Sequence, residues 1–180
     1  AVFRAGILPD DANAVAALLP KLVVDLGFRE NTQRVFLNGE DVSEEIRTPT
    51  ISEYASKTSA IPEVRAFLLH LQRQMAAEHN VLMDGRDIGT VVLPEAQLKV
   101  FLTASPEVRA KRRYKELLEK GQEVSYESIL AEVKARDYRD EHREIAPLKP
   151  AEDAVYLDTS EMSFEEVKNT LIHLAKETFS

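Results

Sequence analysis

The stretch VLMDGRDIGTVVL, residues 81–93, decides the fold of this chain. It opens with the apolar residues Val81–Met83 and turns abruptly polar at Asp84–Asp87. A short apolar run that ends in a glycine-containing turn is typical of a buried strand followed by a loop. We therefore predict a core strand over residues 81–83, with charged side chains at its carboxyl end.

Strands and helices alternate after this stretch. The expected strands are Leu98–Leu102 and Ala154–Leu157, and the expected helices are Glu107–Lys120, Ser125–Arg143 and Phe164–Phe179. Ser105 is expected to cap the first of these helices and Gly121 to end it. Short apolar strands that alternate with helices predict a three-layer α/β domain with a parallel core sheet. Because ligands of such folds bind outside the carboxyl ends of the strands, we expect one edge to gather Asp84–Thr90, Thr103–Ser105 and Asp158–Ser160.

A small antiparallel β insert is expected earlier in the chain. Residues 22–28 and 34–37 have the composition of strands, with a polar turn at residues 29–33 between them. The dipeptide Asn38-Gly39 favours a further tight hairpin turn. The helices expected around the insert are Ala12–Leu19 (capped by Asp10 or Asp11), Thr48–Ala60 and one that begins at Pro62.

Composition bounds the class of protein. At roughly 150 residues per domain, a chain of 180 residues is one domain, or one domain with an insertion. The net charge of -8 is opposite in sign to that of a general nucleic-acid coat, and the absence of cysteine excludes disulfides and thiolate chemistry. No apolar run approaches the about 20 residues that cross a membrane. We therefore expect a soluble, cytoplasmic, acidic protein that binds neither nucleic acid nor membranes, although the chain opens at Ala1 rather than at a methionine.

The turn at Asp84–Asp87 is the first candidate site. An aspartate at a strand end, here Asp84, can hold Mg²⁺ through water, and Arg86 offers a planar fork for a phosphate group. The alternative is a purely structural turn, in which Asp84 or Asp87 caps the next segment and Arg86 neutralises it.

The helix that ends near residue 143 is the second candidate site. At 100° per residue, Arg136, Asp140 and Arg143 fall within a wedge of about 40°, and Arg139 lies about 60° to the other side of Arg136. Two arginines with an aspartate between them can grip a polyanion while the aspartate accepts hydrogen bonds from hydroxyl groups. The alternative is ordinary ion pairing on a solvated helix face. The sparse apolar content of residues 134–144 favours a docked anion.

Two weaker candidates remain. Arg109, Lys111, Arg112 and Arg113 form a cationic cluster before Gly121, which could close over a triphosphate or could be a solvated basic face. Ser56 and Arg65, on either side of a helix break at Pro62, could converge on one flat ligand, although nothing local demands it.

Several chemistries are excluded by missing motifs. The four histidines show no metal-ligand spacing, so no protein metal site is expected, and no G-x-S-x-G elbow occurs. No Gly-Lys pair exists in the chain, so the phosphate-binding loop G-x-x-x-x-G-K-[ST] is absent from these residues.

At Val81–Leu93 the chain resembles the cytidylate kinase family, the bacterial-type CMP/dCMP kinases among the nucleoside monophosphate kinases. The likeness extends along essentially the whole chain. The other stretches that carry it are GEDVSEEIR (39–47), SKTSAIPEVR (56–65), ARDYRD (135–140) and APL (146–148), with Ala151 and Asp153. DGRD-x-GT together with ARD-x-RD is a specific combination.

The resemblance implies a P-loop kinase fold and a reaction. Its parts would be a core (1–21, 79–108 and 144–180), a nucleoside monophosphate-binding insert (22–78) and a lid with the helix after it (109–143), in a single structural unit. The reaction would be γ-phosphoryl transfer from ATP, with Mg²⁺ as cofactor, to CMP or dCMP, and the intact protein would be a monomer.

The resemblance also implies a role for each candidate residue. Ser56, Arg65 and Asp87 match the family's cytosine contacts, and Arg136 and Asp140 match the pair that holds the sugar. Arg86 and Arg143 match the grips on the acceptor phosphate, and Arg109, Arg112 and Arg113 match arginines of the lid near the donor phosphates. An aspartate acceptor suits the exocyclic amine of cytosine, and an arginine-rich site suits phosphoryl transfer.

One part of the family pattern does not occur in these residues. By analogy, about 40 residues with a central strand and the phosphate-binding loop would precede Ala1. We therefore expect residues 1–180 alone to have little kinase activity. The alternatives are a non-catalytic nucleotide-binding fragment that self-associates through exposed sheet edges and, less favoured by the charge of -8 and the few aromatic residues, an RNA-binding module.

Overall fold

The structure is a computed structural model, and it describes residues 1–30 and 32–180. The chain divides into two compact units, an N-terminal unit (Ala1–Asn80) and a C-terminal unit (Val81–Ser180), which are described one at a time. In the described part of the chain, no helix combines the length and the apolar character that crossing a bilayer demands.

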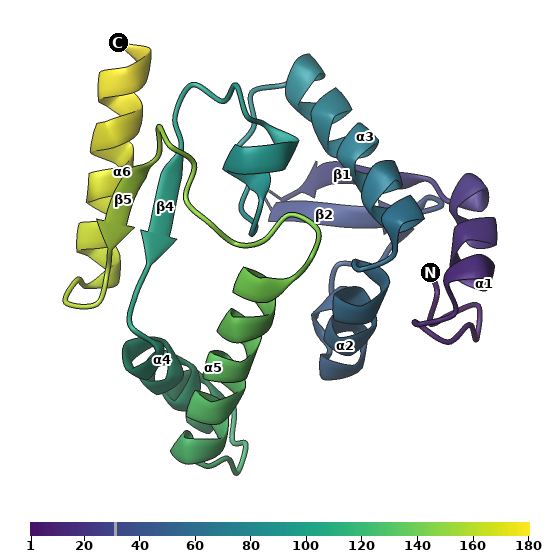
Figure 1. Cartoon of the computed structure of the whole chain (residues 1–180), viewed down its shortest axis with the longest axis horizontal. Coiled ribbons are helices and arrows are strands. Elements are labelled where there is room, and N and C mark those ends of the chain that lie inside the picture. The colour runs from purple at the N-terminus through teal and green to yellow at the C-terminus, as the bar shows by residue number, and fades with distance from the viewer. Residues whose placement is uncertain (31) are drawn as a thin grey trace. The chain divides into compact units, whose positions relative to one another are not determined.

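The N-terminal unit combines a three-stranded antiparallel sheet with helices (Figure 1). Its elements are α1 (Ala12–Leu18), η1 (Leu19–Lys21), β1 (Val24–Arg29), β2 (Thr32–Leu37), β3 (Glu40–Asp41), η2 (Glu45–Arg47), α2 (Pro49–Thr58) and α3 (Pro62–Glu78). The expected β insert and the three helices are confirmed. Asp11 caps α1, because its Oδ1 accepts a hydrogen bond from Ala14 N at 3.0 Å.

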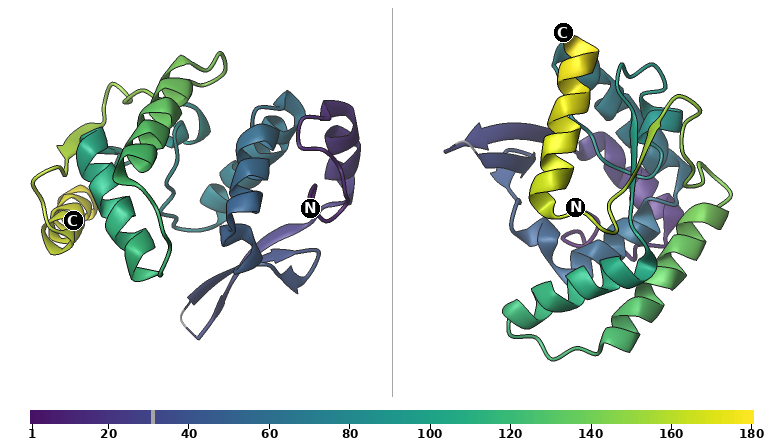
Figure 2. Two further views of the ribbon diagram at one scale, coloured as in Figure 1. Left: turned by 90° about the horizontal axis from the view of Figure 1, so that it is seen from below. Right: turned by 90° about the vertical axis from the view of Figure 1, so that its left-hand side faces the viewer.

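Local sequence explains the sheet. β1 pairs with β2 from Val24 opposite Leu37 to Arg29 opposite Thr32, and Figure 2 shows this hairpin extending beyond the helices of its own unit. The predicted turn at residues 29–33 includes Asn31, which lies outside the described residues. The turn between β2 and β3 has positive φ at both Asn38 and Gly39, which is the backbone that an Asn-Gly pair adopts most readily.

A small apolar core holds the helices of the N-terminal unit together. Val15, Ile61 and Val64 are buried, and Val2, Ile7 and Leu19 pack against them. Burying these side chains supplies the main driving force for joining α1 to the start of α3. The helix break expected near Pro62 is confirmed, because α2 ends at Thr58 and α3 begins at Pro62.

The C-terminal unit contains a parallel sheet of two strands, β4 (Val100–Thr103) and β5 (Val155–Asp158). Its helices are η3 (Ile88–Val92), α4 (Pro106–Glu119), α5 (Tyr126–His142) and α6 (Phe164–Phe179). Figures 1 and 2 show α6 beside the sheet. The helix ends follow local rules: Ser105 caps α4, Gly121 follows it with φ +73, and Ser163 forms a reciprocal capping box with Glu166.

Helices α4 and α5 pack on each other around an apolar cluster. Ala110, Leu117 and Ile129 are buried there, with Tyr114 and Tyr126 in edge-to-face contact at 6.2 Å between ring centroids. Burial of this cluster sets which face of each helix turns toward the other. The charged residues on the remaining positions are therefore brought into defined neighbourhoods.

The predicted strand at residues 81–83 is wrong. Residues 81–84 have no regular structure, Leu82 is fully exposed and Val81 is 42% exposed. A strand is stable only when a neighbour completes its hydrogen-bond ladder. In residues 1–30 and 32–180 no strand pairs with this segment, so its apolar character alone does not hold it in a sheet.

The fold class is confirmed as α/β, with a parallel sheet, a small antiparallel sheet and several helices, consistent with a nucleoside monophosphate kinase fold. The division into core, insert and lid stays a prediction.

Candidate functional site

The carboxyl ends of β4 and β5 meet, as predicted. Thr159 N donates to Thr103 O at 2.8 Å, and the Thr159 hydroxyl donates to the same carbonyl at 2.9 Å. Ser105 N donates to Ser160 Oγ at 2.9 Å, and Ser160 Oγ donates to Asp158 Oδ1 at 2.6 Å. These hydrogen bonds fix the loop after β5 against the start of α4, so this edge of the sheet is rigid and polar.

The third segment expected at this edge, Asp84–Thr90, is not held there by a strand. Gly89 lies near Lys99, which precedes β4, since a Cβ built at Gly89 would stand 3.4 Å from Lys99 Cδ. The prediction that all three segments share one edge is therefore wrong for the part around Gly89. The turn itself needs its first glycine, because a Cβ at Gly85 would stand 2.8 Å from Ile88 Cγ1.

The charged part of this turn contacts α5 instead. Arg86 Nε lies 2.7 Å from Asp140 Oδ2 in a charge-assisted hydrogen bond between residues 54 positions apart. Arg136 Nε lies 3.8 Å from the same oxygen. Asp140 is 21% exposed, so one partly buried carboxylate serves two guanidinium groups. The wedge predicted from helical spacing is thus joined by Arg86.

Arg143 follows directly after α5 and approaches Asp87. Its Nη2 lies 3.6 Å from Asp87 Oδ1, too far for a hydrogen bond, and within the described residues this buried nitrogen has no hydrogen-bond acceptor. Its Nε donates to Ala146 O at 2.5 Å, and Ala146 has the unusual φ of +51. A buried guanidinium nitrogen without an acceptor is costly, and an anionic ligand would remove that cost.

Arg109 is held by hydrogen bonds from three of its nitrogens. Its Nη1 and Nη2 donate to Asp137 Oδ1 and Oδ2 at 2.9 and 2.5 Å, and its Nε donates to Ala104 O at 2.9 Å. The hydrogen bonds from Arg109 are the main cause that lowers the pKa of Asp137. Partial burial acts the other way, and the positive charges of Arg109, Arg86 and Arg136 lower this pKa further. The same hydrogen bonds raise the pKa of Arg109. Both groups are therefore charged near neutral pH.

The other two predicted lid arginines have different partners. Arg112 Nη2 donates to Thr159 O at 2.6 Å and to Met162 O at 3.3 Å, so Arg112 ties α4 to the loop after β5. Arg113 pairs with Glu116 on its own helix at 2.8 Å. Arg112 thus lies at the carboxyl edge of the sheet, whereas Arg113 makes an ordinary surface pair on α4.

Seven residues around α5 form what we call the α5 cluster. They are Arg86, Asp87, Arg109, Arg136, Asp137, Asp140 and Arg143. Its four guanidinium groups face three carboxylates, which leaves an excess of positive charge. Six of the seven are residues that the sequence singled out. Asp137 is the one that was missed, although its place three residues before Asp140, on the same side of the helix, was a usable signal.

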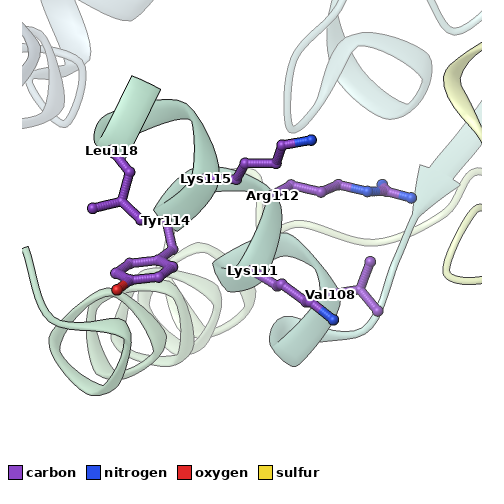
Figure 3. Close-up of a pocket in the computed structure, with 6 residues that line it drawn as sticks. All are labelled: Val108, Lys111, Arg112, Tyr114, Lys115 and Leu118. Carbon is purple, nitrogen blue, oxygen red and sulfur yellow. The ribbon is translucent and has the colours of Figure 1, made fainter. Parts of the chain in front are cut away.

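A shallow hollow of about 440 Å³ lies along α4 (Figure 3). Lys111, Arg112 and Lys115 extend to one side of the helix there, and Tyr114 and Leu118 lie on the other. Its lining contains no carboxylate and shares Lys111 and Arg112 with the cationic cluster predicted from the sequence. It is therefore a feature of the helix surface distinct from the α5 cluster.

The predicted cytosine contacts outside the C-terminal unit are helical residues. Ser56 is an exposed residue of α2, and its carbonyl oxygen accepts a hydrogen bond from Ser59 Oγ at 3.0 Å. Arg65 is a partly buried residue of α3. Both belong to the N-terminal unit and are described with it.

Among residues 1–30 and 32–180, no three His, Asp or Glu side chains gather as a metal site would require. Mg²⁺ in kinases is held by one or two carboxylates together with substrate phosphates, and usually keeps several waters. Asp84 is exposed at the start of the charged turn. Its carboxylate fits an ion that arrives with a nucleotide.

Comparison with known proteins identifies the family of the chain. Residues 1–177 match the family model described as cytidylate kinase. A cytidylate kinase of Carboxydothermus hydrogenoformans is 51% identical over 165 residues, which is 92% of this chain and 74% of that protein. A cytidylate kinase of Pasteurella multocida is 50% identical over 167 residues, which is 93% and 74% of the two chains. One from Syntrophotalea carbinolica is 46% identical over 177 residues, or 98% and 75%.

Proposed function

This chain belongs to the cytidylate kinase family, and from that premise we propose that it serves the transfer of the γ-phosphoryl group of ATP to CMP or dCMP. The family is one of phosphotransferases. In this reaction an oxygen of the acceptor's 5′-phosphate attacks the γ-phosphorus, the bond to the β–γ bridging oxygen breaks, and ADP leaves. The protein contributes mainly positioning and positive charge.

The single observation that carries the proposal is the α5 cluster. A nucleoside monophosphate brings two negative charges on its phosphate, and the cluster has more guanidinium groups than carboxylates. The buried Nη2 of Arg143 has no hydrogen-bond acceptor in the part of the chain that the structure describes, which supports a role as a grip on the acceptor phosphate. Arg86, held by Asp140, is proposed as the second grip.

Selectivity for cytosine is proposed to rest on Asp87. Its carboxylate can accept a hydrogen bond from the exocyclic amine of cytosine, whereas uracil presents a carbonyl at the same position. A base that cannot pair with this carboxylate leaves it without a hydrogen-bond partner, and the site therefore discriminates strongly against that base. Ser56 and Arg65 are proposed as donors to the base carbonyl, and Arg136 with Asp140 as contacts of the sugar hydroxyl groups.

The donor side is proposed to use the arginines of α4 and Mg²⁺. Arg109, Arg112 and Arg113 would counter the charge that develops on the donor phosphates. Mg²⁺, held by Asp84 through water, supplies further neutralisation of the phosphate oxygens when it is bound. We also propose that the chain divides into a core (1–21, 79–108 and 144–180), an insert (22–78) and a lid with the helix after it (109–143).

The test is a titration of the chain with CMP, dCMP, UMP and AMP, followed by calorimetry, together with a coupled assay of ADP formation. We expect CMP and dCMP to bind at least about 10-fold more tightly than UMP or AMP. Comparable affinity for AMP would refute the assignment to cytosine nucleotides. Turnover by residues 1–180 alone is expected to be low, because this sequence contains no Gly-Lys phosphate-binding loop.

A second candidate function has one observation in its favour. In the described residues β4 pairs only with β5, so each strand has an edge without a partner, and Tyr156 of β5 is 63% exposed. Unpaired edges with apolar side chains favour pairing with another chain. A non-catalytic nucleotide-binding chain that self-associates would sediment as a dimer or larger species. A single monomeric boundary across a tenfold range of concentration would exclude it.

A further inference from the structure

Asp137 has no role in the proposed reaction so far, yet it makes a two-point ion pair between two helices. Both of its carboxylate oxygens accept hydrogen bonds from Arg109. The two residues lie on different helices, 28 positions apart in the sequence. An ion pair of this kind orders the arginine more than a single contact would, because a fork that meets a carboxylate at two points has one orientation.

The pair is anchored at a third point. Arg109 Nε donates to Ala104 O, and Ala104 is buried directly after β4. Arg109 is thus fixed to the carboxyl end of a strand, where ligands of parallel sheets bind. An arginine side chain carries five N–H donors, and three of those of Arg109 are engaged, so two remain for a phosphate group.

Further charges surround Asp137. In addition to the hydrogen bonds from Arg109, the positive charges of Arg86 and Arg136 lower the pKa of Asp137. In addition to the hydrogen bonds to Asp137, the negative charges of Glu107 and Glu141 raise the pKa of Arg109. The carboxylate therefore reduces the positive potential at the place where a phosphate would bind. Affinity for a phosphate group therefore does not explain why an aspartate stands at position 137.

We propose that Asp137 is a positioning residue that fixes the guanidinium of Arg109 for the donor phosphates, at the expense of phosphate affinity. The inference rests on the proposed function, in which Arg109 contacts the donor. A guanidinium that is oriented in advance stabilises developing charge without reorganising, whereas a mobile one binds the ground state equally well. Removing Asp137 therefore strengthens the binding of polyphosphate and slows its transfer.

The experiment compares Asp137→Asn with Asp137→Glu and with a matched control, Asp153→Asn. Asp153 pairs with Lys99, at the other end of β4, so the control removes one carboxylate and one ion pair of the same unit. The glutamate variant keeps the charge and can restore the fork. Thermal unfolding of each variant, followed by circular dichroism, establishes that it is folded.

The first measurement reports the orientation of Arg109 directly. In protein labelled with ¹⁵N-arginine, the Nη–H signals of Arg109, which donate to Asp137, are assigned with Arg109→Lys and are expected to exchange slowly with solvent. We expect the exchange of these Nη–H protons to accelerate by about 10-fold in Asp137→Asn, and to stay unchanged in Asp153→Asn. An Arg109 signal equally protected in Asp137→Asn would overturn the proposal.

The second measurement is a titration with sodium tripolyphosphate, an anion without a base or a sugar. Asp137→Asn is expected to bind it about 5-fold more tightly at low salt, with the difference shrinking as salt is added. If the control Asp153→Asn gains as much affinity for tripolyphosphate as Asp137→Asn does, the proposal is overturned, because the effect is then explained by net charge alone.

The third measurement separates this inference from the proposed function. Turnover of ATP and CMP is measured at high protein concentration, because residues 1–180 alone are expected to turn over slowly. Relative to that low rate, Asp137→Asn is expected to lower kcat about 10-fold without raising the KM for ATP, and Asp137→Glu to recover part of kcat. A fall in kcat with an equal rise in the KM for ATP contradicts positioning. If CMP neither binds nor reacts while the first two measurements come out as expected, the assignment to CMP fails and the role of Asp137 toward a polyphosphate stands.

Discussion

Each unit of this protein has a cluster of ion pairs, and the two clusters have opposite charge balances. In the N-terminal unit, which holds what we call the Arg4 cluster, Arg4 lies 2.9 Å from Glu40 and 2.8 Å from Glu45. One guanidinium group there serves two carboxylates. In the α5 cluster four guanidinium groups share three carboxylates, and one of their nitrogens, on Arg143, is buried with no hydrogen-bond acceptor among the described residues.

The difference separates a structural link from a binding site. In the Arg4 cluster all three guanidinium nitrogens donate to carboxylates and negative charge is left over, so the cluster does not favour an anion. The α5 cluster leaves positive charge and an unused donor. The ion pairs alone look alike in the two places, because each joins segments far apart in the sequence. What an anion experiences is the charge that remains after the pairs are formed.

The largest expected effect comes from Arg143→Ala. Loss of a grip on the acceptor phosphate removes about 2 kcal/mol, or roughly 30-fold in the Kd for CMP measured by calorimetry. Thermal stability should change little, since the residue follows the end of α5 and is not part of the apolar cluster. Arg139→Ala, on the same helix but outside the α5 cluster, is the control and should leave the Kd unchanged. A large fall in Tm with Arg143→Ala would make the residue structural and would erase the contrast with the Arg4 cluster.

A smaller effect is expected from Asp87→Ala, which changes selectivity more than affinity. The preference for CMP over UMP should fall about 10-fold, because the acceptor for the exocyclic amine is lost. The ratio of the two dissociation constants measures it, and Asp153→Ala serves as the control. Unchanged selectivity would show that the aspartates of the α5 cluster only balance charge, as the glutamates of the Arg4 cluster do.

Acid should weaken the C-terminal unit through Asp137. Hydrogen bonds from Arg109 hold the pKa of Asp137 below its ordinary value near 3.9. Stability from this pair is therefore present above that value and is lost as the pH falls through the lower pKa of the folded state. Measurements of Tm between pH 7 and pH 3 should show a shallower fall for Asp137→Asn than for the unchanged chain. Parallel curves would mean that the fork contributes nothing to stability.

The smallest effect is expected from Arg4→Ala. The pairs of the Arg4 cluster are exposed, and exposed ion pairs contribute little to stability. Tm should fall slightly, and the fall should vanish in high salt, because salt screens such pairs. The Kd for tripolyphosphate should be the same as in the unchanged chain. Weaker binding of the anion would show that this cluster also serves a ligand.

The sequence predicts best what depends on near neighbours. Ser163 and Glu166 form a reciprocal cap because they lie three residues apart at a helix start. Asn38 and Gly39 turn the chain because both adopt positive φ at low cost. The failed strand at residues 81–83 belongs to the opposite case, since apolar residues form a strand only where a distant segment pairs with them.

By itself, the sequence determined the helices, the hairpin, the α/β class and six of the seven members of the α5 cluster. Only the tertiary structure decided which guanidinium meets which carboxylate, and therefore that Asp137 holds Arg109 while Asp140 holds Arg86. The physical reason is that charge attraction is not selective by residue: each arginine could pair with any nearby aspartate. The packing of α4 on α5 around Ala110, Leu117 and Ile129 removes that degeneracy by bringing particular residues within reach.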